Sequence, residues 1–175
     1  MTRKLLQLLI LPVSIAALGG NTRAVSPEVD SRLAFAAIKA LEGSWAAPAD
    51  SNRKSTVRFE LSANGTVVVE HYTNPAIPGG GRMMSAYYLD GKDLLLTHYC
   101  IANNQPTLRA ERFDPESREL QFEFLRATNL ATQNTGHMRR AKYRLIDKDR
   151  FVTEWEFFEN GVKKMTETEV FARVK

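Results

Sequence analysis

The chain has 175 residues, the length of a single domain, and is long enough to bury a core without cross-links. Its only cysteine is Cys100, which excludes an intramolecular disulfide. It carries 24 Lys and Arg against 20 Asp and Glu, a balance that invites a nucleic-acid or anionic-membrane interpretation.

The first residues account for most of that basic excess. A basic pair precedes an apolar run of 14 residues at 5–18, and small residues follow up to Ala24. This order is typical of a secretory signal peptide, and the run is shorter than the roughly 20 residues of a spanning helix. We therefore predict a signal peptide at 1–24 and one periplasmic or secreted domain at 25–175. Without the signal, 21 basic residues face 20 acidic ones, so we expect no nucleic-acid partner and no stable membrane insertion.

One helix is predicted at the start of the mature domain, over Ser31–Glu42, with Asp30 or Ser31 as its N-cap. The residues at helical spacing are Leu33, Ala36, Ala37, Ala40 and Leu41.

From Gly43 onward the apolar period changes to two, and turn signals such as Asn64-Gly65, Asp90-Gly91 and Asn160-Gly161 recur. The predicted strands are 43–48, 55–62, 66–73, 82–90, 93–102, 106–113, 118–126, 138–146, 150–159 and 162–173. Ten strands in simple order favour closure, which removes exposed edges. The fold class is therefore all-β: an up-and-down antiparallel β-barrel of about ten strands with one N-terminal helix.

Alternation predicts which side chains face the interior. A tight hairpin centred on Asn103-Asn104 sets Cys100 opposite Thr107 and His98 opposite Arg109, all on one face. The predicted ligand-binding residues on the inner side are Tyr87, His98, Cys100, Arg109, Phe122, Phe124, His137 and Trp155.

The C-terminal strands are assigned in the same way. A two-residue turn at Asn160-Gly161 turns Thr166, Thr168 and Val170 inward and leaves Glu154, Glu156, Glu167 and Glu169 outside. The outer acids then pair with Arg140, Lys142 and Arg144, while His137, Ala141, Tyr143 and Leu145 face inward.

Several short stretches resemble a group of uncharacterised exported bacterial proteins with a lipocalin-like fold. They are Leu96-Thr97-His98-Tyr99-Cys100, Asn104-Gln105-Pro106, Asn129 and Gly136-His137-Met138, and the resemblance runs from about Leu41 to Lys175. The Gly43-Ser44-Trp45 stretch also looks like the Gly-x-Trp start of calycin barrels. The resemblance implies a small hydrophobic ligand. The sequence departs from the group at Asn103, where the group has glycine.

Polar groups among apolar walls indicate an interior that holds a ligand. We predict a small, mostly hydrophobic ligand whose acidic or carbonyl group is directed at Arg109 and His98, with no cofactor. Alternatively, Arg109 pairs with Glu111 and His98 in a purely structural network.

Two further interpretations remain open. In a haem or metal barrel, one histidine holds haem, as in nitrobindin-like proteins, or His98 and Cys100 bind an ion completed by His137 or His71. The nitrobindin pattern fails after Trp45. In a small enzyme, Cys100 is the nucleophile, a histidine (His137 before His98) is the base and Arg109 is the oxyanion partner.

Overall fold

The computed structural model describes residues 29–48 and 54–175. The predicted signal peptide at 1–24 lies outside the described residues. No helix within the described ranges has the length and apolar character needed to span a bilayer.

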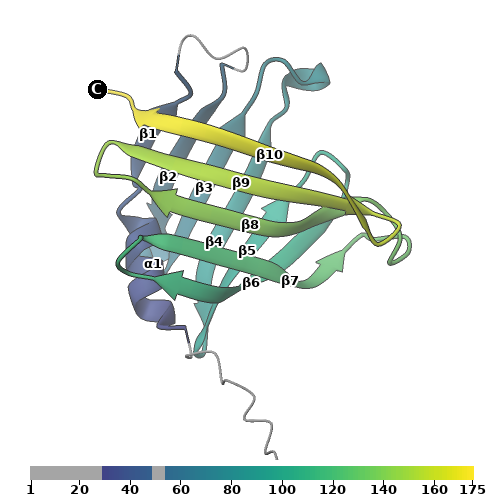
Figure 1. Cartoon of the computed structure of the whole chain (residues 1–175), viewed down its shortest axis with the longest axis horizontal. Coiled ribbons are helices and arrows are strands. Elements are labelled where there is room, and N and C mark those ends of the chain that lie inside the picture. Colours follow the sequence, from purple (N-terminus) through teal and green to yellow (C-terminus); the bar gives the residue numbers. More distant parts are fainter. Residues whose placement is uncertain (1–28, 49–53) are drawn as a thin grey trace, which may run out of the picture.

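The described chain forms one closed antiparallel barrel in which each strand is hydrogen-bonded to its sequence neighbour (Figure 1). This confirms the predicted all-β barrel with one helix. The strands are β1 (Gly43–Ala46), β2 (Thr56–Ser62), β3 (Val67–Thr73), β4 (Met83–Asp90), β5 (Asp93–Tyr99), β6 (Gln105–Asp114), β7 (Glu119–Thr128), β8 (His137–Leu145), β9 (Arg150–Glu159) and β10 (Val162–Arg173). Short 3₁₀ turns lie at Ala63–Gly65 and Pro78–Gly80.

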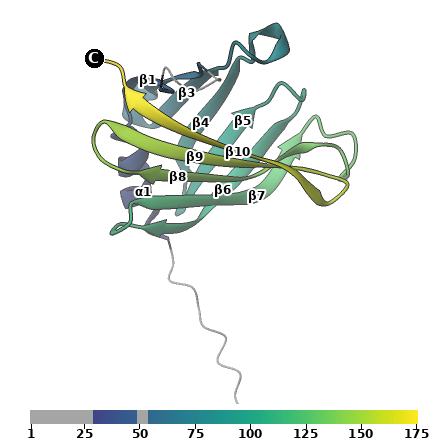
Figure 2. The same cartoon turned by 45° about the horizontal axis from the view of Figure 1, so that its top comes forward.

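The single helix α1 (Ser31–Lys39) lies at one end of the barrel, as Figures 1 and 2 show. Asp30 is the N-cap, because its carboxylate accepts a hydrogen bond from the Leu33 N–H at 3.0 Å. The helix is shorter than predicted, and the face that it buries differs from the predicted one. Leu33 is 48% exposed, and the buried helical residues are Ser31, Ala34, Phe35 and Ile38.

The barrel closes between its first and last strands, with Trp45 opposite Arg173. The Trp45 indole N–H donates to the Leu41 carbonyl at 2.7 Å, and the Arg173 guanidinium lies 4.0 Å from the centre of the indole ring. Arg173 also donates to the carbonyls of Glu42 and Ala40. One arginine therefore joins the last strand, the indole and the chain leaving the helix, and it holds that end of the barrel shut.

Alternation separates an apolar interior from a charged exterior. Aromatic rings fill the half of the barrel near α1, where the Phe151 ring lies 4.9 Å from that of Trp45 and 5.1 Å from that of Phe171. The other large, fully buried side chains are Tyr87, Tyr143, Phe59, Phe122, Ile38, Leu41, Leu94, Leu96 and Leu108. The predicted inward positions on β4, β5 and the first half of β7 are thereby confirmed.

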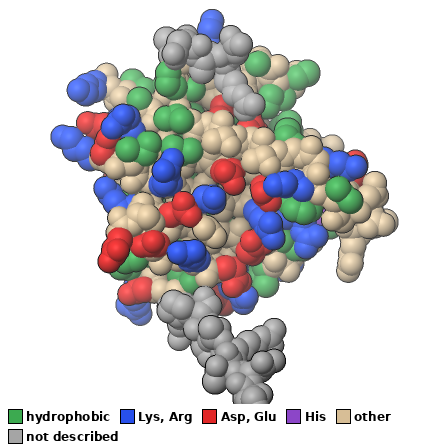
Figure 3. Space-filling view, in the orientation of Figure 1, with side chains coloured by type: hydrophobic (Ala, Val, Ile, Leu, Met, Phe, Trp, Pro, Cys, Tyr) green, Lys and Arg blue, Asp and Glu red, His purple; other side chains and the backbone are tan. Residues whose placement is uncertain are grey.

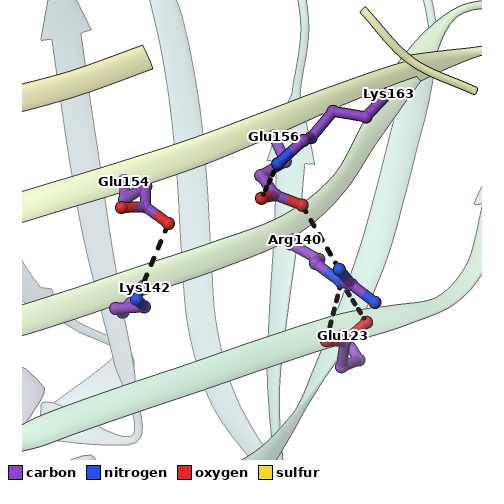
Figure 4. A network of polar contacts seen from close by, with 6 residues as sticks. All are labelled: Glu123, Arg140, Lys142, Glu154, Glu156 and Lys163. Carbon is purple, nitrogen blue, oxygen red and sulfur yellow. Dashed lines mark hydrogen bonds and ion pairs between the residues drawn. The ribbon is translucent and has the colours of Figure 1, made fainter. Parts of the chain in front are cut away.

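Of the three basic residues of β8 predicted to pair with outer acids, Arg140 and Lys142 form such ion pairs on the outer wall (Figure 4). Arg140 contacts Glu123 at 2.8 Å and Glu156 at 3.5 Å, while Lys142 lies 3.6 Å from Glu154. Figure 3 shows basic and acidic side chains interspersed over this face. Most of these groups are solvent-exposed, so their contribution to stability is small, and their main effect is to keep the face soluble.

The hairpin between β5 and β6 has a different register from the predicted one. Asn103 adopts a φ of +61°, and its N–H donates to the Cys100 carbonyl while the Cys100 N–H donates to that of Asn104. A three-residue loop with a left-handed third residue results. Thr97, and not Cys100, therefore lies opposite Thr107.

This odd shift in register moves Arg109 to the outside of the barrel, so its predicted place in the interior is wrong. Arg109 lies opposite Leu95, not His98, and its guanidinium bonds the exposed Glu111 carboxylate at 2.7 Å. The pairing with Glu111 matches that part of the alternative structural network, and His98 takes no part in it.

A β-bulge in β10 overturns the predicted face of that strand. The register shifts between Lys163 and Met165, so Glu167 lies opposite Trp155 and Glu169 opposite Thr153. Two glutamates predicted to face solvent therefore face the interior. Outside lie Thr166, Thr168 and Val170, the residues predicted to face inward.

The register of β10 can be tested by truncation on its two faces. We expect Phe171→Ala to lower the free energy of unfolding by about 3–5 kcal/mol, because it leaves a cavity beside Phe151. The neighbouring Val170→Ala, on the outer face, should cost less than about 1 kcal/mol. Urea denaturation of both variants measures the difference, and equal costs would contradict the bulge.

Candidate functional site

A cavity lies inside the barrel at the end away from α1, where β4 and β8 begin and β5 ends. Its volume is about 30 Å³, which is room for one or two water-sized groups. The described residues that line it are Glu70, Tyr72, Met83, His98, Met138, Thr153, Trp155, Glu167, Glu169 and Phe171. Three of them are glutamates and none is Lys or Arg, so carboxyl groups are the ionisable groups of acidic type that dominate the lining, and we call this cavity the acidic cavity.

Glu70 lies at the bottom of the cavity and is 4% exposed. The Tyr87 hydroxyl donates to its carboxylate, and so does the Tyr143 hydroxyl at 3.0 Å. The two phenol oxygens are 2.6 Å apart. Burial raises the pKa of Glu70 to about 7, a rise that the two phenol hydrogen bonds oppose and the nearby Glu169 adds to.

Glu169 comes from β10, which β1 and β2 separate from β3, the strand of Glu70. Its carboxylate accepts a hydrogen bond of 2.5 Å from the Ser55 hydroxyl, and that hydroxyl lies 3.4 Å from the phenol oxygen of Tyr72. Burial raises the pKa of Tyr72 above its ordinary value. The phenol is therefore protonated at neutral pH, and the Asn74 amide donates to its oxygen.

His98 supplies the nitrogen atoms of the cavity wall. Its Nδ1 lies 3.1 Å from the Ser85 hydroxyl, and its ring is 4.8 Å from that of Trp155. Its Nε2 is buried and has no hydrogen-bond partner among the described residues. Burial lowers the pKa of His98 to about 4, so the ring is neutral at pH 7. A buried nitrogen without a partner on the wall of a cavity is available to a bound group.

Asn104, Asn129 and Gly136, which come from three of the sequence stretches quoted above, lie near one another at one corner of this open end. The Asn104 amide donates to the Gly136 carbonyl at 2.8 Å, and the Asn129 amide donates to the Asn103 carbonyl. A β-carbon on Gly136 would lie 2.5 Å from the Phe157 ring, so any other residue at this position would have to displace that ring. The loops after β5 and β7 are thereby tied together around the rim.

The predicted site residues separate into four groups. His98 and Trp155 line the acidic cavity, and Tyr87 and Phe122 belong to the packed core. Phe124 and His137 line a second cavity, between β7 and β8. Cys100 is half-buried in the β5–β6 loop, and Arg109 lies outside.

The arrangement gives little support to the interpretations in which Cys100 or a metal carries the chemistry. Burial raises the pKa of the Cys100 thiol, which disfavours the reactive thiolate. His71 lies on the outer face, 3.3 Å from Glu60. Within the described ranges, no group of three or more His, Cys, Asp or Glu side chains is arranged to hold a metal ion.

Sequence reasoning missed the acids of the cavity. Glu70 could have been found, because it alternates with Val68 and Tyr72 on a strand otherwise rich in valine. Glu167 and Glu169 could not, because nothing in the local sequence marks the bulge that turns them inward.

No protein-family model matches the sequence, and no curated protein matches it.

The two buried ionisable groups predict opposite dependences of stability on pH. Glu70 holds its proton up to about pH 7 in the fold but only to about 4.5 when unfolded, so its contribution to stability falls as pH rises through that window. His98 has a pKa of about 4 in the fold against 6.5 unfolded, so its contribution rises with pH from 4 to 6.5. Between pH 4.5 and 6.5 the two contributions offset one another.

Single substitutions should separate these slopes. We expect the free energy of unfolding of Glu70→Gln to rise by about 3 kcal/mol as the pH increases from 4 to 6.5, because the opposing contribution of Glu70 is absent and that of His98 remains. The free energy of unfolding of His98→Gln should fall by a similar amount as the pH increases from 4.5 to 7, because only the contribution of Glu70 remains. Urea denaturation at a series of pH values measures both, with Glu154→Gln on the outer wall as the control. Parallel profiles for Glu70→Gln and the wild type would contradict the assignment.

Proposed function

We propose that this protein is an exported, lipocalin-like barrel that binds a small, mostly apolar molecule through its open end. We further propose that the ligand carries an amine, and that its ammonium group occupies the acidic cavity. The observation that carries the proposal is the set of three glutamates facing one small cavity that has no Lys or Arg among its described lining residues. Because Arg109 lies on the outer face, it cannot receive the acidic ligand group that the sequence led us to expect in the interior.

Electrostatics favours a cationic head group. A buried carboxylate charge is costly unless it is both hydrogen-bonded and paired with a cation. Glu70 and Glu169 already accept hydrogen bonds from Tyr and Ser hydroxyls, which leaves their charge without a cation among the described lining residues. Glu169 raises the pKa of Glu70, so an ammonium ion between them would relieve this repulsion.

The size and the walls of the cavity fit the same ligand. A volume of about 30 Å³ accepts an ammonium-sized head but not a haem or a whole acyl chain. Trp155 and Tyr72 offer aromatic faces of the kind that attract cations. Met83 and Met138 have flexible thioether side chains, which can move aside for an apolar body at the mouth.

The proposal is tested by titration calorimetry with n-hexylammonium and with 1-hexanol, which has the same chain and no charge. We expect the amine to bind at least about tenfold more tightly than the alcohol at pH 8, because a charge-assisted contact is lost in the alcohol. Binding should weaken at pH 6, where Glu70 is protonated.

Matched variants locate the binding site. Glu169→Gln keeps the shape of the side chain and should weaken hexylammonium binding by about tenfold. Glu154→Gln removes a glutamate of the outer wall, beside Lys142, and should change nothing. Equal affinities for amine and alcohol, or equal losses in the two variants, would refute the proposal.

A further inference from the structure

Strands β7 and β8 separate towards the open end of the barrel. Their pairing ends at Glu123 opposite Arg140, after which β7 continues to Thr128 beside β6 alone, and the first residues of β8 pair only with β9. A cavity of about 550 Å³ lies there, in the size range of ligand sites. Its walls include Phe124, Leu125, Arg126, Leu130, His137 and Arg139.

The charges of this cavity differ from those of the outer wall beside it. Arg140 lies between the carboxylates of Glu123 and Glu156 (Figure 4). Among the described residues, its neighbour Arg139 forms no ion pair. Figure 3 shows several Lys and Arg side chains at this end of the molecule, with acidic side chains beside them. The cavity contains two arginines and no acid among its described lining residues, so it attracts anions.

Arg139 is held in place without a carboxylate. Its guanidinium carbon lies 5.2 Å from the centre of the Phe124 ring and 5.5 Å from that of Phe158. Stacking on aromatic rings orients the guanidinium plane and leaves its N–H groups free to donate. A planar fork of donors suits a carboxylate, which can accept two of them at once.

His137 adds a second and different contact. The residue is 3% exposed, and its Nδ1 lies 2.6 Å from the Thr135 carbonyl oxygen. Because a carbonyl can only accept, Nδ1 carries a proton, and in the tautomer with that single proton Nε2 is an acceptor. Within the described part of the chain, that buried Nε2 has no hydrogen-bond partner. A ligand that satisfies it must bring a hydrogen-bond donor.

The geometry points to a second ligand site in the gap between β7 and β8, which takes an apolar carboxylic acid that also carries a hydroxyl or N–H donor. The carboxylate binds the Arg139 guanidinium, the donor bonds Nε2 of His137, and the apolar body contacts Phe124 and Leu130. This site has the opposite charge preference from the acidic cavity, and it does not rest on the function proposed for that cavity.

Three small molecules test the chemistry by calorimetry with the full chain: 3-phenyllactate, 3-phenylpropionate, which lacks the hydroxyl, and 3-phenylpropylamine, which has the opposite charge. We expect phenyllactate to bind about fivefold more tightly than phenylpropionate, because only phenyllactate pairs the buried nitrogen. Phenylpropylamine binding should be unaffected by substitutions in the gap. If the wild type binds neither acid at millimolar concentration, the inference is wrong.

Variants assign the contacts. Arg139→Gln should weaken both acids by about tenfold, whereas Arg144→Gln, an exposed arginine on the same strand, should leave both unchanged. His137→Asn retains an N–H for the Thr135 carbonyl but lacks Nε2, so it should abolish the preference for phenyllactate. Equal losses in the two arginine variants would overturn the inference, as would a preference that survives in His137→Asn.

The two sites are distinguished by Glu169→Gln. This variant should bind phenyllactate as the wild type does, even if hexylammonium binds neither protein. Loss of phenyllactate binding in Glu169→Gln would mean that the acid enters the barrel interior, which would contradict a separate site in the gap.

Discussion

The shortest strand of the barrel, β1 with four residues, closes against the longest, β10 with twelve. So small a seam is reinforced by one side chain: Arg173 lies over the Trp45 indole and donates to two carbonyls of the chain that connects α1 to β1. Closure gives every strand two neighbours and creates an interior. The aromatic core, the buried carboxylate and the cavity above it all exist because this seam holds.

Within the closed barrel, the polar groups are ordered by depth. Near α1 the interior is filled with aromatic rings, and further up the hydroxyls of Tyr87 and Tyr143 meet Glu70 at the boundary of the cavity. The tyrosines thus present apolar rings to the core and polar ends to the acid. Outside this axis the arginines of the β7–β8 gap form a separate basic region. A cationic ligand would therefore be attracted to the barrel interior, and an anionic ligand to the gap between β7 and β8.

The sequence was sufficient for the architecture, because alternation and turn dipeptides are local signals. Ten strands, the helix and its Asp30 cap follow from them, as do the inward positions of Tyr87 and Phe122. The errors arose where one residue changes the count. The loop closed by Asn103 moved Arg109 outside, and the extra residue in β10 moved Glu169 inside. Such shifts depend on tertiary packing, since either register satisfies the local pattern. The candidate site was therefore predicted only in part: His98 and Trp155 were found, and its acids were not.

The bulge in β10 also has an evolutionary consequence. The strand alternates threonine and glutamate over Thr166–Glu169, so both sets are suited to face either water or the barrel. If the extra residue moved from Lys164 to Thr168, past Glu167, that acid would turn outward while Glu169 and Phe171 stayed in place. The number of interior charges could thus drift between relatives by insertion and compensating deletion, without any acid being gained or lost. A family of such barrels could diverge in ligand charge while its amino-acid composition stayed constant.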